Sequence, residues 1–382
     1  MKFQGDHGML PQQTQDEHSR HQFLVEMKET LYRSLAPGLT TIYESRAKPV
    51  FEKKHGRLPK DRHDVAEVME HQEYYQMWSA LARAQHELYV DSTTATVERQ
   101  LPELVDRFRM YADKPKYGSL CLNNEFEIPS YQSKVDIHCV PGGYCMELTD
   151  DDVYTGARYD IGFYMYSLGN DGPYNDAMAK GALAYLSKHF QNVQPKKILD
   201  LGCTGGFCSI PYVDAFPEAM VHAIDISAPC LRYAHARAES LGKAVHFSQQ
   251  NAEHTHFEDS SFDLIVSHIL LHETSRKAVY NIMKECFRLL KPGGVCLHLE
   301  VPVKHRDLEP LEQYLRDWST FNNNEPFWGT LHDMDIMDPI IKAGFQKEHV
   351  FDDYTLGSEA EFLASDRGWT VFGAQKATDI DQ

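Results

Sequence analysis

The sequence predicts an α/β protein whose second half forms a doubly wound, mostly parallel sheet behind a mainly helical N-terminal region. Three observations lead to this fold class. From residue 196 onward, apolar runs alternate with helical segments, and a glycine-rich turn follows the first run. Residues 21–112 carry apolar side chains at helical spacing instead. At 382 residues the chain exceeds one typical domain, and we expect two.

The N-terminal part is expected to be helical. Residues 1–20 are polar and predict a disordered or loose N-terminus. Residues 64–90 and 94–112 predict helices, and two β-prone runs around Pro141-Gly142-Gly143 predict a hairpin over 131–148, in which His138 is interpreted as a core histidine. We expect residues 21–150 to form a lid or dimerisation domain that gives a homodimer, and residues 151–382 to form the second domain.

The second half provides the strands and helices of the sheet in order. Two further runs near the end are expected to close the sheet as an antiparallel pair, at 345–354 and 368–376. The predicted strands are 196–202, 219–227, 244–252, 262–272 and 294–302, and the helices between them are 206–216, 228–241 and a third that ends near 290.

The turn after the first strand lies in "ILDLGCTGGFC" (198–208). Gly202 allows a sharp turn, while Gly205 and Gly206 allow close approach of a ligand and of the next helix. Asp225 ends the second strand about 20 residues later, where a carboxylate can accept both ribose hydroxyls. Loop and carboxylate together predict an adenosine-containing ligand. NAD and S-adenosylmethionine both fit this arrangement.

Several later segments decide between these cofactors. The chain resembles the class I S-adenosylmethionine-dependent methyltransferases, near the ubiquinone/menaquinone-biosynthesis type with a methyltransferase type 11/12 domain. The resemblance covers about 190–376 and is carried by "ILDLGCTGG", "AIDIS", "QQNAEH", "FDLIVSHILLHE", "RLLKPGGVCLHLE", "AGFQKEHVF" and "GWTVFGAQK". It implies a Rossmann-like sheet of seven strands with an antiparallel last hairpin, and S-adenosylmethionine as cofactor.

The resemblance also implies which residues bind the cofactor. Thr204 stands where glycine is usual, and Asn251 stands where aspartate is usual. The implied contacts are Asp200, Gly202, Cys203, Thr204 and Gly205 along the methionine part, Asp225 at the ribose, Ile226, Asn251 and Ala252 at the adenine, and Ser267 near the sulfonium.

Candidate catalytic residues follow the fourth strand in "SHILLHETS" (267–275). His268, His272 or Glu273 could take a proton from an acceptor, although His272 and Glu273 could also simply cap the next helix. Two histidines four apart suit a metal on a helix, but no third ligand is apparent, so no metal site is predicted. Tyr159 and Tyr164 could cover the sulfonium, or pack on the sheet.

The composition of the chain limits the classes of binding partner and the cellular compartment that we expect. The net charge of −18 excludes a phosphate backbone or an anionic membrane as the main partner. No apolar run of membrane length or signal peptide is apparent, so we expect a soluble cytoplasmic protein. The eight cysteines form no C-x-x-C pair and hence no zinc framework.

The sequence therefore predicts methyl transfer from S-adenosylmethionine to a small molecule, with the acceptor atom (O, S, N or C) left open. Phe327 and Trp328, in the insertion 321–335, are expected to shape the acceptor pocket. Two alternatives stay open: an NAD(P)-dependent oxidoreductase, and a non-catalytic binding protein on the same fold.

Overall fold

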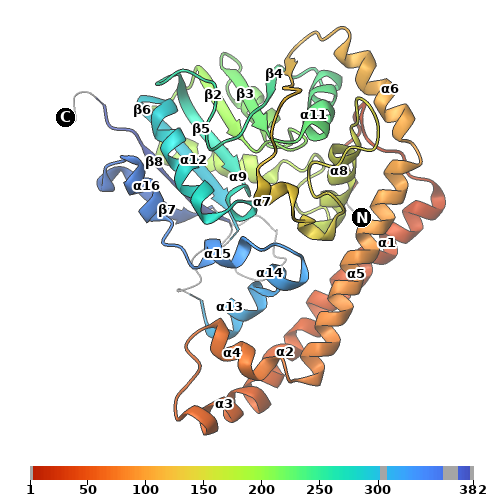
Figure 1. Cartoon of the computed structure of the whole chain (residues 1–382), viewed down its shortest axis with the longest axis vertical. Helices are drawn as coiled ribbons and strands as arrows, with labels where there is room; N and C mark the ends of the chain where they lie inside the picture. The colour runs from red at the N-terminus through yellow and green to blue at the C-terminus, as the bar shows by residue number, and fades with distance from the viewer. Residues whose placement is uncertain (1–2, 302–307, 356–368, 379–382) are drawn as a thin grey trace.

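A computed structural model describes residues 3–301, 308–355 and 369–378, and its centre is one mixed sheet (Figure 1). The strand order is β1-β4-β3-β2-β5-β6-β8-β7, parallel from β1 to β6 and antiparallel where β8 joins β6 and β7. The strands are β1 (Ser119–Cys121), β2 (Lys197–Leu201), β3 (Met220–Asp225), β4 (Val245–Gln249), β5 (Phe262–His268), β6 (Leu290–Glu300), β7 (Val350–Tyr354) and β8 (Thr370–Gln375).

The predicted count of seven strands is wrong by one. All seven expected strands are present, and β1 adds an eighth at the edge of β4. Three residues are too short to show a strand pattern in the sequence. Tertiary contacts hold the segment instead: the N–H groups of Lys116, Tyr117 and Gly118 donate to the carboxylate of Glu239 at 2.7–3.0 Å.

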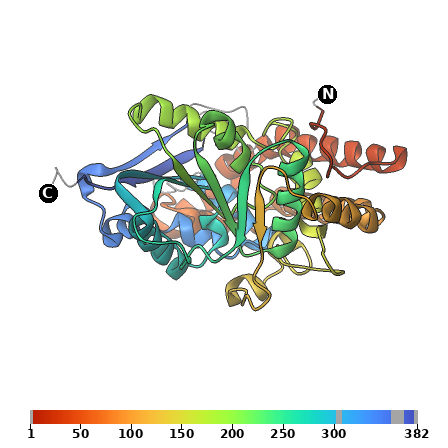
Figure 2. The same ribbon diagram turned by 90° about the horizontal axis from the view of Figure 1, so that it is seen from above.

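Helices cover both faces of the sheet, as Figure 2 shows. Alternate residues of β2 face opposite sides: Ile198 joins one apolar cluster, and Leu199 and Leu201 join the other. The first cluster includes residues of α9 (Ala177–His189), α10 (Ser209–Ala215) and α11 (Ala228–Ser240), and the second includes residues of α12 (Arg276–Leu289) and α16 (Met337–Ala343).

The N-terminal helices form an arm beside the sheet, in which α1 and α5 run next to each other (Figure 1). The arm meets the sheet unit through α8 (Tyr154–Tyr166), which packs on both α5 and α11. The helices of this region are α1 (Gln15–Glu29), α2 (Ala36–Ile42), α3 (Lys48–His55), α4 (Arg62–Met69), α5 (Glu73–Glu98) and α6 (Leu101–Ala112), with π-helical turns at Thr30–Leu35 and Tyr43–Ala47.

The insertion between β6 and β7 is attached to this arm. It contains α13 (Pro310–Arg316), α14 (Trp318–Asn322) and α15 (Trp328–His332). Arg62 of α4 donates two hydrogen bonds of 2.7 Å to Asp333 and also lies 3.0 Å from Asp317. Trp318 packs in one apolar cluster with Phe51 and other residues of the arm. The arm and the insertion therefore form one body at the side of the sheet.

The predicted hairpin at 131–148 does not form. Residues 130–139 instead contain α7 (Ser130–Ser133) and a 3-10 turn (Ile137–Cys139). Left-handed backbone at His138, Cys139, Gly142 and Gly143 prevents extended strands, because strand residues require negative φ.

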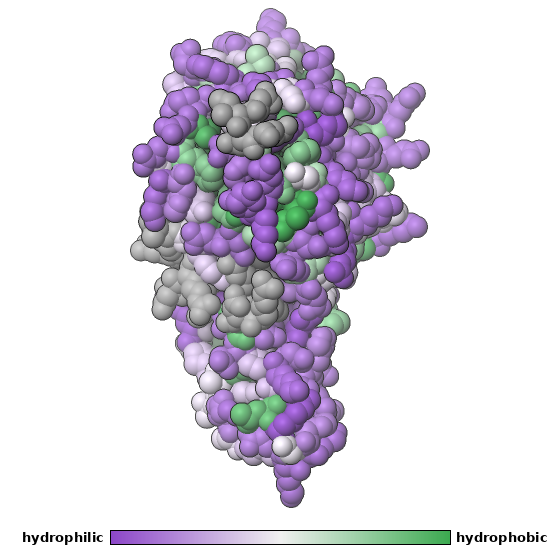
Figure 3. Space-filling model, turned by 90° about the vertical axis from the view of Figure 1, so that its left-hand side faces the viewer, coloured by the Kyte–Doolittle hydropathy of each residue, from purple (hydrophilic) through white to green (hydrophobic). Residues whose placement is uncertain are grey.

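The described part of the N-terminus is packed, in contrast to the loose segment expected for residues 1–20. Met9 is fully buried in the cluster that includes residues of α6, α8 and α11. His7 lies 3.0 Å from Asp160, and Thr14 caps α1. Among the described residues, no helix combines the length and apolar character that crossing a bilayer requires. Figure 3 shows one face of the molecule, which is mostly hydrophilic.

Candidate functional site

The parallel register brings three predicted site residues to one edge of the sheet. Leu201 of β2 pairs with Ile224 of β3 on one side and with Ser267 of β5 on the other. The residues that follow these three are Gly202, Asp225 and His268. The glycine turn, the strand-end aspartate and the histidine therefore meet where ligands of doubly wound sheets bind.

The glycine turn holds its shape through left-handed backbone. Gly202, Thr204 and Gly206 have φ of 69°, 46° and 71°. The Thr204 N–H donates to Asp225 Oδ2 at 2.9 Å, whereas the Thr204 hydroxyl reaches only the Gly202 carbonyl at 3.5 Å. Thr204, which stands where glycine is usual in the resembled family, therefore positions the Asp225 carboxylate through its backbone N–H.

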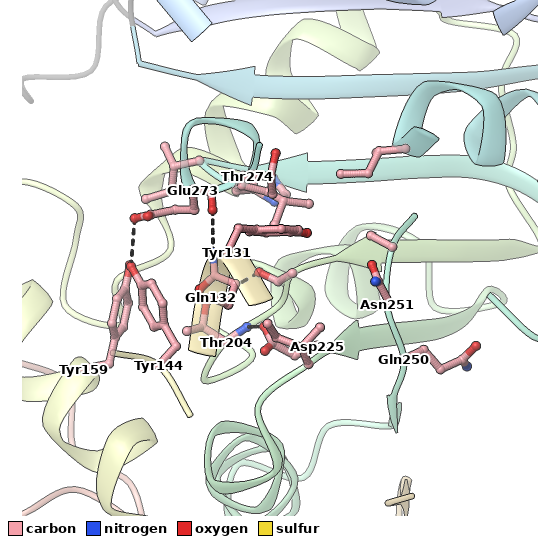
Figure 4. Close-up of a pocket in the computed structure, with 17 residues that line it drawn as sticks. Tyr131, Gln132, Tyr144, Tyr159, Thr204, Asp225, Gln250, Asn251, Glu273 and Thr274 are labelled. Atoms are coloured by element: carbon pink, nitrogen blue, oxygen red, sulfur yellow. Dashed lines mark hydrogen bonds between the residues drawn. The ribbon is translucent and has the colours of Figure 1, made fainter. Parts of the chain in front are cut away.

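A cavity that is partly open to solvent lies along this edge (Figure 4). Glu273 and Tyr144 lie at one end, Asn251 at the other, and Asp225 with Thr204 between them. Nine of the predicted site residues line the cavity: Tyr159, Gly202, Thr204, Asp225, Ile226, Asn251, Ala252, His268 and Glu273. A smaller adjoining space adds Asp200 and Cys203.

Four predicted residues lie outside both spaces. Gly205 is confined within the turn, where an added Cβ would lie 2.3 Å from the Phe207 ring. The Ser267 hydroxyl is buried against His298 Nδ1 at 2.8 Å. His272 binds Glu300, and Tyr164 on α8 lines neither space. Strand alternation explains Ser267, because neighbouring residues of β5 point to opposite faces.

Asp225 is a buried carboxylate with two N–H donors, Thr204 and Ser227, the latter at 2.8 Å. Burial raises the pKa of Asp225 to about 6, although these N–H groups offset part of the effect. Asn251 lines the adenine end expected from the sequence, and its Oδ1 accepts a hydrogen bond from the Glu253 N–H at 2.9 Å. Among the described residues, no partner is found for its amide Nδ2, so this N–H group can donate to a ligand or to water.

His268 ends β5 and is tied into the sheet edge. Its Nε2 lies 3.1 Å from the Tyr212 hydroxyl, and its Nδ1 lies 3.4 Å from Asp200 Oδ1. Asp200 in turn accepts a hydrogen bond of 2.6 Å from the Ser209 hydroxyl. Both ring nitrogens thus face partners within the protein, which makes His268 part of the wall of the cavity.

Glu273 lies in a 3-10 turn (Leu271–Glu273) that follows β5, and it was among the predicted catalytic residues. Its Oε1 accepts a hydrogen bond of 3.0 Å from the Tyr144 hydroxyl and lies 2.9 Å from His138 Nε2. Burial raises the pKa of Glu273, but the neighbouring His138 and His272 outweigh burial and lower it. Glu273 is therefore held as a carboxylate at the wall of the cavity.

The interpretation of His138 as a core histidine is wrong. Its side chain is partly exposed and bridges Glu273 and Glu325, with Nδ1 3.2 Å from Glu325 Oε1. Burial lowers the pKa of His138, but the two carboxylates outweigh burial and raise it to about 10. In the same way Glu300 outweighs burial and raises the pKa of His272 to about 9.

The sequence also missed Tyr131, Gln132 and Tyr144, which line the cavity from the segment after β1. Tyr131 packs edge-on against Phe327, with ring centroids 5.7 Å apart. Trp328 packs edge-on against His272 at 5.1 Å. Phe327 therefore packs behind the cavity-lining Tyr131, but neither Phe327 nor Trp328 lines the cavity itself, so their role at the acceptor stays a prediction. The sequence holds no pattern that marks the three missed residues, since the segment has only two tyrosines, Tyr131 and Tyr144.

These residues fit S-adenosylmethionine. Asp225 offers a carboxylate for ribose hydroxyls, Ile226 and Ala252 offer apolar contacts beside it, and Tyr159 offers an aromatic face near the turn.

Comparison with known proteins finds similarity in the segment that forms this edge of the sheet. Residues 198–294 match the family model described as a methyltransferase domain. The chain is 33% identical over 136 residues to demethylmenaquinone methyltransferase of Lactococcus lactis, which covers 35% of this chain and 51% of that protein. It is 29% identical over 113 residues to ubiquinone biosynthesis O-methyltransferase of Pectobacterium carotovorum, which covers 29% of this chain and 46% of that protein.

Among solved structures, the chain is similar to phosphoethanolamine N-methyltransferase 2 of Haemonchus contortus in complex with S-adenosylhomocysteine. The TM-score is 0.43 at 19% identity, covering 57% of this chain and 58% of that one. The chain spans about half or less of the length of the curated relatives that it matches. The matched segment nevertheless includes the glycine turn, Asp225, Asn251 and the residues that follow β5. Residues 198–294 therefore match a methyltransferase domain, and this match includes the edge of the sheet that lines the cavity.

Proposed function

We propose that the protein transfers the methyl group of S-adenosylmethionine to a small-molecule acceptor bound beside Glu273. The observation that carries this proposal is the placement of that carboxylate. Glu273 lines the cofactor cavity, and it is held by Tyr144 and His138 from the segment after β1. The acceptor space then lies between the end of β5, that segment and the insertion after β6.

The cofactor supplies an activated methyl group, and the protein supplies alignment and a dry cavity. In this proposal Asp225 holds the ribose and the N–H-rich glycine turn follows the methionine part. Tyr159 and Tyr144, whose ring centroids lie 5.8 Å apart, present aromatic faces to the sulfonium. Glu273 accepts a hydrogen bond or a proton from an O–H, N–H or S–H group of the acceptor.

The two predicted catalytic histidines take positioning roles in this proposal. His272 lines neither space, and its Nδ1 is bound to Glu300 at 2.7 Å. His268 is held by Tyr212 and Asp200 as described above. His268 and Glu273 both line the cavity, and each has one polar atom without a hydrogen-bond partner among the described residues, His268 Nδ1 and Glu273 Oε2. We assign the acceptor to Glu273 because His268 Nδ1 faces the Asp200 carboxylate at 3.4 Å.

A small acceptor is favoured over nucleic acid by the net charge of −18. Relatives of the matched segment include a tRNA methyltransferase of Drosophila melanogaster and a ribosomal RNA methyltransferase of Phocaeicola vulgatus, so RNA is the competing acceptor to test. The homodimer expected through the N-terminal helices stays a prediction, which sedimentation equilibrium tests.

The experiment incubates the protein with cell extract and methyl-labelled S-adenosylmethionine, then separates acid-soluble metabolites from precipitated RNA. Label in a soluble product that is chromatographically separate from S-adenosylmethionine, lost in Glu273→Gln but kept in a variant of the exposed Glu98, supports the proposal. Label confined to RNA would show that the acceptor class is wrong.

A further inference from the structure

The cavity and the smaller adjoining space separate beside the glycine turn. The smaller space is lined by Asp200 and Cys203, which are expected along the methionine part, and Glu273 does not line it. Glu273 instead lines the cavity, at the end opposite Asn251 (Figure 4). The two spaces share Tyr159, Gly202, Thr204, His268 and Ile269. In the proposed function the sulfonium lies at this shared wall, so Glu273 faces the acceptor and not the methionine part.

The wall of the cavity is acidic. Among the described residues that line it, Asp225 and Glu273 carry carboxyl groups, and none is lysine or arginine. Asp225 is assigned to the ribose, which leaves the Glu273 carboxylate for the acceptor. A carboxylate or phosphate group on the acceptor would therefore be buried near like charge without a counterion, which is costly.

The ion-pair network behind Glu273 does not cancel its charge. The neighbouring carboxylates outweigh burial and raise the pKa of His138 to about 10 and that of His272 to about 9, so both are imidazolium groups at neutral pH. His138 contacts Glu273 and Glu325. His272 contacts Glu273 and Glu300. Three carboxylates therefore face two imidazolium groups, and one negative charge stays in excess.

One oxygen of Glu273 still needs a donor. Its Oε1 accepts from the Tyr144 hydroxyl at 3.0 Å and lies 2.9 Å from His138 Nε2. Its Oε2 is buried and has no hydrogen-bond partner among the described residues. A buried acceptor without a partner is destabilising, and more so when it is charged. Because Glu273 lines the cavity, a ligand bound there can supply the missing donor.

Aromatic rings frame the same end of the cavity. Tyr144 and Tyr159 lie beside Glu273, with their ring centroids 5.8 Å apart (Figure 4). Tyr131 also lines the cavity and packs edge-on against Phe327. Aromatic faces attract cations through their quadrupole. A buried carboxylate framed by aromatic rings is therefore suited to an ammonium group.

We propose that the methyl acceptor is an aliphatic amine without a carboxylate or phosphate group, bound with its nitrogen beside Glu273. This inference rests on the proposed function. The nitrogen lone pair forms the new N–C bond while the C–S bond of the cofactor breaks and its electron pair passes to sulfur. The positive charge moves from sulfur to nitrogen, where the Glu273 carboxylate stabilises it. One N–H proton of the product later leaves to solvent.

An alcohol, a phenol or a thiol suits this wall less well. Such a group becomes a strong nucleophile by losing its proton, and the resulting anion would form beside Glu273. Burial raises the pKa of Glu273, but His138 and His272 outweigh burial and lower it, so this carboxylate is a weak base at neutral pH. A neutral amine already carries the lone pair that attacks the methyl group and becomes a cation, not an anion.

The first test measures binding without methyl transfer. The full chain, saturated with S-adenosylhomocysteine, is titrated at pH 7 by calorimetry with 2-phenylethylamine, 2-phenylethanol and phenylacetate, which are a cation, a neutral molecule and an anion of one size. We expect the amine to bind at least tenfold more tightly than the alcohol, and phenylacetate to bind most weakly. Glu273→Gln should reduce the preference for the amine to less than threefold, whereas Glu98→Gln, at an exposed position of α5, should keep it.

Affinity for S-adenosylhomocysteine within threefold of the unaltered protein shows that both variants are folded. Equal titrations with the amine and the alcohol, including no binding of either, overturn the inference. A preference for the amine that survives in Glu273→Gln also overturns it, because the carboxylate would then not be the group that selects the cation.

The second test determines the charge of the labelled product from the extract incubation. After separation from S-adenosylmethionine, the soluble product should be retained by a cation exchanger at pH 7 and keep its label in dilute alkali, as a methylated amine does. A product that is neutral or anionic at pH 7, or that loses its label in alkali, overturns this inference and leaves methyl transfer to a small molecule standing. Label confined to RNA, or no label at all, overturns the proposed function and this inference with it.

Discussion

The Thr204 N–H donates a 2.9 Å hydrogen bond to Asp225 Oδ2, which joins the turn after β2 to the end of β3. The carboxylate that is proposed to hold the ribose is therefore already positioned by the loop that is proposed to hold the methionine part. Its other oxygen accepts from the Ser227 N–H. The two halves of the cofactor site are expected to act as one unit in binding.

Replacing Asp225 tests this unit directly. Asp225→Ala removes the carboxylate for two ribose hydroxyls and the acceptor for Thr204 N–H. Hydrogen bonds to charged groups contribute about 1.5–3 kcal/mol each, so S-adenosylhomocysteine should bind at least 100-fold more weakly. Calorimetry measures the loss, with the exposed Asp106→Ala on α6 as control. Undiminished affinity would show that the site has been assigned wrongly.

Cofactor binding should depend on pH through Asp225. Its pKa of about 6 means that the carboxyl group is protonated in the cofactor-free protein below that pH. A protonated carboxyl group accepts ribose hydroxyls poorly, so binding must first release the proton. Affinity for S-adenosylhomocysteine should be constant above about pH 7 and fall about tenfold per pH unit below 6. Calorimetry from pH 5 to 8 checks this, and Asp225→Asn should bind weakly without this pH dependence.

Thr204→Gly should stabilise the protein. Threonine at φ of 46° is strained by about 1–3 kcal/mol, while glycine adopts this region readily at an entropic cost of roughly 0.5–1 kcal/mol. The net expectation is a gain of about 1 kcal/mol in the free energy of unfolding, measured by urea denaturation. Cofactor affinity should change less than threefold, since the backbone N–H remains. A loss of stability would mean that the hydroxyl contributes more than its 3.5 Å contact suggests.

Glu273→Gln should separate methyl transfer from cofactor binding. The substitution keeps the size of the side chain and removes the charge that accepts a proton or a hydrogen bond from the acceptor. We expect kcat to fall at least 100-fold, within the range of a lost general base, and S-adenosylhomocysteine affinity to stay within threefold. Steady-state kinetics and calorimetry on one preparation check both values. Full activity would remove Glu273 from the proposed mechanism.

Arg62→Ala should loosen the attachment of the arm to the insertion. The guanidinium bonds Asp333 twice and lies 3.0 Å from Asp317, which is mostly buried. Removing it leaves Asp317 without its cation, at a cost of about 3–5 kcal/mol in the free energy of unfolding. Urea denaturation measures the loss, and Arg33→Ala, which removes the cation of an exposed pair with Glu29, should cost less than 1 kcal/mol. Equal losses in both variants would contradict the role of Arg62.

The sequence predicted the parts of the fold that depend on local pattern. The strands that end at Leu201, Asp225 and His268 have apolar runs and characteristic turns after them, so their order and the common edge followed. The segment 131–148 was misread because its glycines and β-prone residues are compatible with a hairpin. Left-handed backbone at non-glycine His138 and Cys139 cannot be read from the sequence.

The candidate site, like the fold, could be predicted from the sequence only where its residues follow a local pattern. Gly202 and Asp225 are separated by a fixed interval along the chain, and spacing of this kind is visible in a sequence. His138, Glu273 and Glu325 are brought together over 187 positions (from 138 to 325) by the packing of three segments. Such contacts have no periodicity and leave no pattern, which explains why the cluster around Glu273 emerged only from the structure.

The short strand β1 makes the N-terminal region part of the catalytic domain's own architecture. β1 covers the edge of β4, which would otherwise present unpaired N–H and C=O groups to other chains. A shortened chain that starts at the expected boundary near residue 151 would lack this cover, and edge-to-edge aggregation is the outcome to expect. Any attempt to express the methyltransferase domain alone should therefore begin before Lys116, so that the bonds to Glu239 are kept.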